Sequence, residues 1–193
     1  APIQWAIING ETITGITTMY TDIGMDTGDI LLTDAVAIGP DETAGELYAR
    51  LAVLGAGTLA RTIDALMEGT LRRIPQDEEK ATKCMMLKKE HGRLDFTHTA
   101  QQVHDRIRGT NPWPGAYAML DDEPIKIWKS RHSTRLDLPR CAPGRCIAPD
   151  ERRLFVRCGD EPLEILELQL PGGKRQDAAT FLRGHAMHGV RLT

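Results

Sequence analysis

Apolar and polar residues in the first part of the chain follow patterns that predict a helix and two strands. Pro2–Asn9 is typical of the end of a helix, which the dipeptide Asn9-Gly10 stops because it favours left-handed backbone. Thr14–Thr21 and Asp29–Ile38 are rich in β-branched and aliphatic residues, which indicates strands. The glycine-rich turn between them, Gly24–Gly28, leads us to expect that the two strands pair as a hairpin.

The next segment carries leucine and isoleucine mostly at steps of three and four residues, which is typical of a helix with one face turned to the core. These residues are Leu47, Leu51, Leu54, Leu59, Ile63 and Leu66. We expect the helix to begin near Thr43, with Asp41 or Thr43 as its cap, and to end at Gly69. Gly55 and Gly57 are expected to divide it into two segments.

A charged stretch from Pro75 to Arg93 predicts a connection between two domains. After it, Thr97–Arg108 predicts a short helix with Val103 and Ile107 on one face. Short strand-like runs separated by Pro and Gly then predict a small β-barrel. These runs are Ala116–Leu120, Ile125–Lys129, Leu154–Arg157 and Leu163–Leu168, and Asp177–Arg183 is expected to add a closing helix.

The composition, 41% hydrophobic and 26% charged residues, is that of a globular protein. No apolar run approaches the roughly 20 residues that cross a bilayer, and the first residues do not form a signal peptide. We therefore expect a cytoplasmic protein without a membrane partner, with reduced cysteines. The spacing of cysteine and histidine indicates no metal site.

The formal net charge of −3 is unevenly distributed. Residues 1–75 carry four basic and ten acidic side chains, a net charge of −6, whereas residues 76–193 carry a net charge of +3. Opposite signs indicate different partners for the two parts. An excess of +3 is far below that of a strongly basic nucleic-acid-binding domain, so an RNA contact would need a local cluster of basic side chains.

Three stretches together are specific enough to indicate a family. They are APIQWAIINGETITGITTMYTDIGMDTGDIL at 1–31, IRGTNPWPGAYAML at 107–120 with IKIWKS at 125–130, and LEILELQLPGGKRQDAATFLRG at 163–184. Their order and spacing resemble methionyl-tRNA formyltransferases over essentially the whole chain. Related folate-dependent formyltransferases share the Gly-x-Asp-x-Gly loop and the Pro-Trp-Pro-Gly segment. The pair Asp26 and Asp29, joined to the GGKR-x(5)-FLRG ending, favours the tRNA enzyme.

The resemblance implies two domains. Residues 1–75 would be an α/β remnant of a Rossmann-like formyltransferase domain, residues 76–95 a linker, and residues 96–193 a small OB-like β-barrel. The implied reaction transfers a formyl group from 10-formyltetrahydrofolate to the amine of methionyl initiator tRNA, without a metal. We expect a monomer.

The resemblance also implies roles for the glycine-rich loop. Asp26 matches the catalytic aspartate of the family, which would hold a histidine in its useful protonation state. Gly24, Met25 and Asp26 are expected to lie beside the folate. Considered without the resemblance, Asp26 would be an ordinary turn residue, and Asp22 and Asp29 are expected to be solvated or to cap the turn.

The sequence departs from the family pattern at one important place. The family carries its catalytic Asn and His just upstream of a Ser-Leu-Leu-Pro…Arg-Gly loop, which directly precedes the segment that matches Ala1–Gln4. That part is not in this sequence. We therefore expect the chain by itself to be inactive, and we assign no catalytic role to any of its six histidines.

The C-terminal part offers basic residues for a tRNA surface, since phosphates are bound chiefly through charge. The candidates are Arg106, Arg108, Lys126, Lys129, Lys174 and Arg175. Lys126 and Lys129 are expected to point outward from one strand. For the segment Asn111–Gly115 we expect a structural role, with prolines that rigidify the loop and Trp113 anchored in a core.

Two other interpretations remain open at this point. The chain could be a stand-alone RNA-binding barrel with residues 1–75 as leftover scaffold. Alternatively, the same fold could serve another formyl acceptor, such as a sugar nucleotide amine, or hydrolyse the folate. The upstream sequence distinguishes the first alternative from the enzyme, and acceptor assays distinguish the second.

Overall fold

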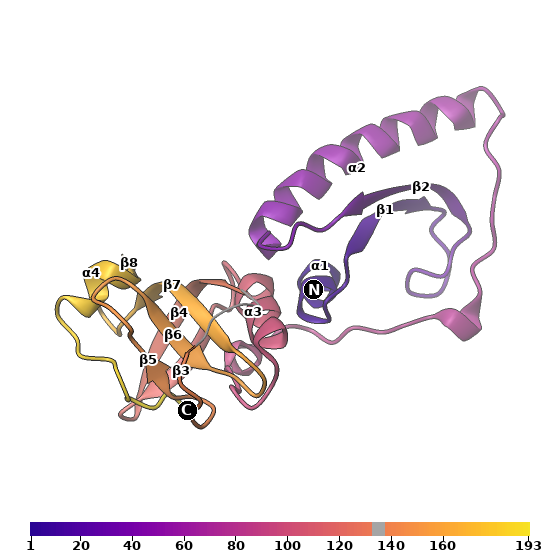
Figure 1. The fold of residues 1–193 in the computed structure, drawn as a ribbon. Helices are drawn as coiled ribbons and strands as arrows, with labels where there is room; N and C mark the ends of the chain where they lie inside the picture. The colour runs from indigo at the N-terminus through magenta and orange to yellow at the C-terminus, as the bar shows by residue number, and fades with distance from the viewer. Residues whose placement is uncertain (133–137) are drawn as a thin grey trace.

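The protein, described here from a computed structural model covering residues 1–132 and 138–193, contains two separate hydrophobic cores. The smaller core consists of Ile7, Ile38, Ala44, Leu47 and Leu51 and defines an N-terminal unit. The larger one gathers buried residues between Leu94 and Leu192 and defines a C-terminal unit. Figure 1 shows the two units side by side, joined by a long connection that passes along the outside of the N-terminal unit.

The N-terminal unit is a helix, a hairpin and a long helix. Its elements are α1 (Pro2–Ile8), β1 (Ile13–Met19), β2 (Ile30–Ala37) and α2 (Ala44–Met67). Strands β1 and β2 pair antiparallel from Ile13↔Ala37 to Met19↔Ile30, which confirms the expected hairpin. Helix α2 lies across one face of this two-stranded sheet (Figure 1).

Helix α2 is one continuous helix, so the expected break at Gly55 and Gly57 is wrong. Thr43 caps it with a capping box, in which the Thr43 hydroxyl accepts from the Glu46 N–H and the Glu46 carboxylate accepts from the Thr43 N–H. A glycine costs a helix only about 1 kcal/mol relative to alanine. The helix is held by buried residues on both sides of the glycines, Leu47 and Leu51 before them and Thr58 and Thr62 after them.

The second half of the apolar stripe on α2 is exposed, contrary to the expectation of a core-facing helix. Leu59, Ile63 and Leu66 are each about half exposed. The hairpin is instead met by Thr58 and Thr62, and the Thr62 hydroxyl lies 2.8 Å from that of Thr18. Helical periodicity identified an apolar face, but it could not show which face meets the hairpin.

We expect the substitution Gly57→Ala to stabilise the N-terminal unit. A Cβ at residue 57 would meet no atom of the described residues within 4 Å, and alanine lowers the cost of forming the helix by about 1 kcal/mol. Urea unfolding followed by helical circular dichroism measures the gain. Gly28→Ala should have the opposite effect on stability, because its Cβ would lie 1.7 Å from the Tyr20 carbonyl oxygen. A Gly57→Ala protein less stable than the wild type would contradict this account of α2.

The C-terminal unit is an antiparallel sheet with helices α3 and α4 packed against it. Its elements are α3 (Ala100–Gly109), β3 (Ala116–Leu120), β4 (Glu123–Arg131), β5 (Cys146–Ile147), β6 (Leu154–Arg157), β7 (Pro162–Gln169), β8 (Gln176–Asp177) and α4 (Ala178–Leu182). The strand order is β3-β4-β7-β6-β5, and β8 pairs with β7. Two 3₁₀ turns, η1 (Glu78–Lys80) and η2 (Lys89–Gly92), lie in the connection. The described helices contain no segment with both the length and the hydrophobicity needed to cross a membrane.

The C-terminal segment bridges the two edges of this sheet. Thr193 exchanges backbone hydrogen bonds with Met119 at one edge, with lengths of 2.6 and 3.0 Å. Leu192 donates to the carbonyl of Gly144 near the other edge, at 2.8 Å. The sheet is therefore strongly curled around its core. Cys146 and Cys158 lie in that core, where burial raises the pKa of each thiol to about 12 and keeps it protonated.

Buried polar residues of α3 join the two units. The Arg108 guanidinium donates to the carbonyls of Gly39 and Glu42 at 3.0 and 3.1 Å, and it is paired with Asp105 at 2.7 Å. The His104 Nε2 lies 3.0 Å from the Pro40 carbonyl oxygen. Because a carbonyl only accepts, Nε2 carries a proton and Nδ1 accepts from the Ser130 hydroxyl, 2.8 Å away. Both ring nitrogens of neutral His104 are thus satisfied.

We expect the junction between the units to weaken in acid. Burial lowers the pKa of His104, and Arg108 adds to this, whereas the Pro40 carbonyl, Asp105 and Asp41 oppose it. The folded protein therefore binds this proton less readily than the unfolded chain does. The contribution of His104 to stability is complete above about pH 6.5 and is lost as the pH falls below it.

The effect is measured by comparing the melting temperatures of the wild type and His104→Gln at several pH values above and below about 6.5. His104→Gln should show a flatter dependence on pH. His98→Gln, at an exposed histidine paired with Asp95, should keep the dependence of the wild type. Equal slopes for the wild type and His104→Gln would rule out His104 as the titrating group.

Candidate functional site

The loop between β1 and β2 presents Asp26 on a turn held by its backbone. Asp26 has a positive φ of 56°. Gly28 is buried against the Tyr20 carbonyl, where no larger residue fits without moving backbone. The Gln76 side-chain amide donates to the carbonyl oxygens of Asp26 and Gly28, at 2.8 and 2.7 Å. The conformation of the loop is therefore fixed from outside by a residue about fifty positions away.

A second set of contacts fastens the base of the loop to the segment after α2. Ile30 and Ile74 exchange backbone hydrogen bonds of 2.8 and 2.9 Å. The Arg73 Nε lies 2.8 Å from Asp29 Oδ2, and its guanidinium lies 4.7 Å from the centre of the Tyr20 ring. Asp29, expected to be solvated or to cap the turn, is thus an ion-pair partner. No local spacing in the sequence could have indicated Arg73 or Gln76.

The tip of the loop is open to solvent. Gly24, Met25 and Asp26 are all exposed, and Met25 is 92% exposed. In the described part of the chain, neither a histidine nor any other side chain bonds to the Asp26 carboxylate. The loop therefore offers a free carboxylate beside an apolar side chain, held by a fixed backbone. Such a carboxylate can orient and polarise a partner that approaches from outside.

Two basic candidates lie over one indole ring on the C-terminal sheet, and a third lies nearby in the sequence. The Lys126 Nζ lies 5.1 Å from the centre of the Trp128 ring, and the Arg175 guanidinium carbon lies 5.2 Å from it. Arg175 also forms an ion pair with Glu167, and exposed Lys174 precedes it in the loop. We call Lys126, Trp128, Lys174 and Arg175 the basic cluster.

Lys129 is exposed, but for a different reason than expected. Two residues three positions apart point to opposite faces of a regular strand. In β4 the pairing shifts on both sides of Lys129, which is a β-bulge, and this returns the side chain to the exposed surface. It faces the cleft between the two units, where Glu46 is a neighbour. There the backbone N–H and hydroxyl of Thr43 hold the pKa of Glu46 below its usual range, and Lys129 adds a smaller effect.

The two arginines of α3 are less available. Arg108 is buried and fully engaged in the junction between the units, so we leave it out of any RNA surface. Arg106 is half-buried, and it donates to the His91 carbonyl at 2.9 Å. Burial lowers its pKa, and Asp95 opposes this effect. Helical position alone could not separate these two residues from exposed ones.

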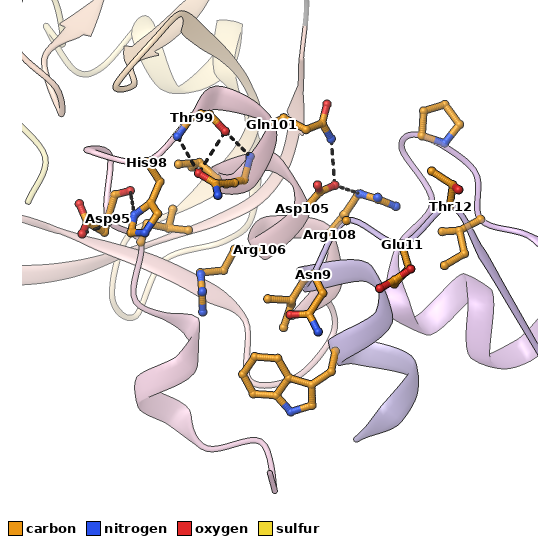
Figure 2. A pocket seen from close by; sticks show the side chains of 18 residues that line it. Asn9, Glu11, Thr12, Asp95, His98, Thr99, Gln101, Asp105, Arg106 and Arg108 are labelled. Carbon is orange, nitrogen blue, oxygen red and sulfur yellow. Dashed lines mark hydrogen bonds and ion pairs between the residues drawn. The ribbon is translucent and has the colours of Figure 1, made fainter. Parts of the chain in front are cut away.

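A second cleft between the units, of about 840 Å³, is lined by apolar and polar side chains, and its charged groups are of both signs. Figure 2 shows Asn9 and Glu11 on one side and the side chains of α3 on the other. Asp105 accepts from Arg108 at 2.7 Å and from Gln101 at 3.0 Å. These groups thus largely satisfy one another. Within residues 1–132 and 138–193, no group of three His, Cys, Asp or Glu side chains could hold a metal ion.

Comparisons with known proteins assign the two units to one family. Residues 1–63 match the model described as formyl transferase, and residues 86–186 match the model described as formyl transferase, C-terminal domain. The methionyl-tRNA formyltransferase of Solibacter usitatus is 48% identical over 186 residues, which are 96% of this chain and 58% of that protein. That of Geobacter metallireducens is 46% identical over 193 residues, 100% of this chain and 61% of its own length. The chain thus spans about three-fifths of these relatives.

Solved structures share the fold at low identity. HypX from Aquifex aeolicus, in complex with tetrahydrofolic acid, superposes with a TM-score of 0.68 at 17% identity, over 93% of this chain and 32% of that one. The N-formyltransferase of Helicobacter canadensis, in complex with folinic acid and dTDP-3-aminofucose, gives a TM-score of 0.69 at 19% identity, over 90% and 60%. By its two matching domains and its relatives, the chain belongs to the formyl transferase family.

Proposed function

We propose that the chain supplies the catalytic aspartate and an RNA-binding domain of an enzyme that formylates methionyl initiator tRNA. The donor would be 10-formyltetrahydrofolate. The observation that carries the proposal is the loop at Asp26, whose backbone is held by Gln76 while its carboxylate is left free. A rigid backbone with an unoccupied carboxylate is what a catalytic position needs.

The chemistry requires a carboxylate at this place. The methionine amine attacks the formyl carbon, and the bond from that carbon to the folate nitrogen then breaks. In the process the amine loses a proton and the folate nitrogen gains one. Asp26 would hold the partner histidine, carried by the upstream part of the family pattern, in the state that moves this proton. Donors from the same upstream part would stabilise the oxyanion.

The folate is proposed to lie against the tip of the loop. The exposed Met25 side chain offers an apolar surface to a flat ring, and the bare backbone of Gly24 allows close approach. We retain the division into a Rossmann-like part at 1–75, a linker at 76–95 and an OB-like barrel at 96–193 as proposals. The curl of the C-terminal sheet, with its edges bridged by Leu192 and Thr193, supports the barrel.

The tRNA is proposed to meet the basic cluster and Lys129. Lys126, Lys129, Lys174 and Arg175 are exposed on the C-terminal unit, and Arg106 adds a half-buried charge on α3. Lysine and arginine contacts to phosphates give affinity without sequence specificity. The tRNA would then be recognised partly through contacts that lie at a distance from the methionine amine that reacts.

An acceptor assay tests the proposal. We define the hybrid enzyme as the protein in which residues 1–193 replace the matching part of the Geobacter metallireducens relative. With 10-formyltetrahydrofolate, the hybrid should formylate methionyl-tRNA and leave a sugar nucleotide amine unchanged. Formylation of the sugar, or release of formate without an acceptor, would instead assign the chain to another activity of the same fold.

A further inference from the structure

The loop Asn111–Gly115 carries an exposed side chain that the proposed function does not use. Trp113 was expected to anchor the loop in a core, but its side chain is 52% exposed, so that expectation is wrong. The loop itself is well held. The Gly115 N–H donates to the Thr110 carbonyl at 2.9 Å, and the Asn111 side-chain amide donates to the Trp128 carbonyl at 2.9 Å. An indole is thus presented to solvent by a fixed loop.

Trp113 forms one wall of a groove of about 750 Å³ on the C-terminal sheet. The floor comes from the outward positions of β3 and β4, where Tyr117 pairs with Lys126 and Met119 pairs with Pro124. The other walls are Pro114, Gly115, Lys89, Gln169 and the turn Leu170–Gly172. Two aromatic rings and several apolar side chains therefore line the groove. Lys126 belongs both to this groove and to the basic cluster.

The charge of the groove is of one sign. Among the described residues, its lining includes Lys89 and Lys126 and no carboxylate. Each of the two clefts between the units, by contrast, mixes arginines with carboxylates, which pair with one another. An occupant that suits the groove is therefore flat and apolar in one part and negatively charged in another. A nucleotide has both properties.

We propose that this groove binds an unpaired nucleotide of an RNA chain. Its base would stack on Trp113, and its phosphates would lie near Lys89 and Lys126. The base must be unpaired, because in a duplex both faces of a base are covered by its neighbours. This inference rests on the proposed function, since it specifies how the C-terminal unit holds the RNA.

Binding of a fluorescently labelled single-stranded RNA of about six nucleotides to the 193-residue chain tests the groove. Trp113→Ala should weaken binding about 5- to 150-fold, because stacking on an aromatic ring contributes that much per base. Trp113→Phe should retain most of the affinity. Tryptophan emission should be quenched by the RNA in the wild type, and this quenching should be smaller in Trp113→Phe.

Controls separate the groove from the basic cluster. A blunt RNA duplex of the same length should bind equally well to the wild type and to Trp113→Ala. If Trp113→Ala binds the single strand within about twofold of the wild type, the groove is not a stacking site. In that case salt-dependent binding of tRNA by the wild type would leave the proposed function intact. If the wild type binds neither RNA, the inference and the proposed tRNA surface both fail.

Discussion

Asp26→Asn in the hybrid enzyme should reduce the turnover of methionyl-tRNA formylation by at least about 10²-fold. The exchange keeps the shape of the side chain and removes the negative charge that would hold the partner histidine. The backbone contacts from Gln76 to the carbonyls of Asp26 and Gly28 do not involve the carboxylate, so the loop should keep its conformation. Steady-state kinetics with saturating folate measure the effect.

Asp22 provides the matched control in the same loop. It is also an exposed aspartate, and its carboxylate accepts from the N–H of the next residue, Ile23, at 2.7 Å. An asparagine side chain can accept the same hydrogen bond. Asp22→Asn should therefore stay within about threefold of the wild type, whereas a similarly small effect of Asp26→Asn would identify Asp26 as a turn residue only.

Binding of tRNA by the 193-residue chain should fall steeply with salt. Each phosphate contact on a duplex contributes a slope of about −0.9 to the plot of log affinity against log salt concentration. A surface that uses three or four contacts should therefore lose roughly 40- to 150-fold between about 50 and 200 mM salt. Titrations at several salt concentrations give the slope directly.

The double variant Lys126→Ala/Lys174→Ala should flatten this slope by about two units, one per contact removed. Arg175 is a weaker choice, because its ion pair with Glu167 already offsets part of its charge. Arg152→Ala serves as the control, since Arg152 is exposed in the loop before β6, a strand that β7 separates from β4. A slope that the double variant leaves unchanged would show that the cluster is only solvated surface.

The local structure of the chain could largely be predicted from its sequence. The hairpin, the cap at Thr43, the end of α2 before Gly69 and the main strands of the C-terminal sheet all lie close to the expected positions. These features depend on neighbouring residues, such as a β-branched run or a threonine three positions before a glutamate. The break at Gly55 was predicted wrongly because tertiary contacts outweigh the low helix propensity of glycine.

The features that depend on contacts between distant residues could not be predicted. Gln76 reaches back across about fifty residues to the loop at Asp26, and nothing near it in the sequence indicates this. Arginine is usually found on the surface, yet Arg108 is buried at the junction of the two units, where it is paired with Asp105. Trp113 is the opposite case, because its hydrophobicity suggested a position in a core, whereas its side chain is exposed in the fold.

The most direct test compares the formylation of methionyl-tRNA by the isolated 193-residue chain and by the hybrid enzyme. We expect no detectable turnover for the chain, which would lack its histidine and oxyanion donors. For the hybrid we expect turnover of about 1 to 10³ per second, the range of ordinary enzymes. A folded hybrid that leaves methionyl-tRNA unformylated, or an isolated chain that turns over within that range, would contradict the assignment of Asp26 and of the RNA-binding surface to this reaction.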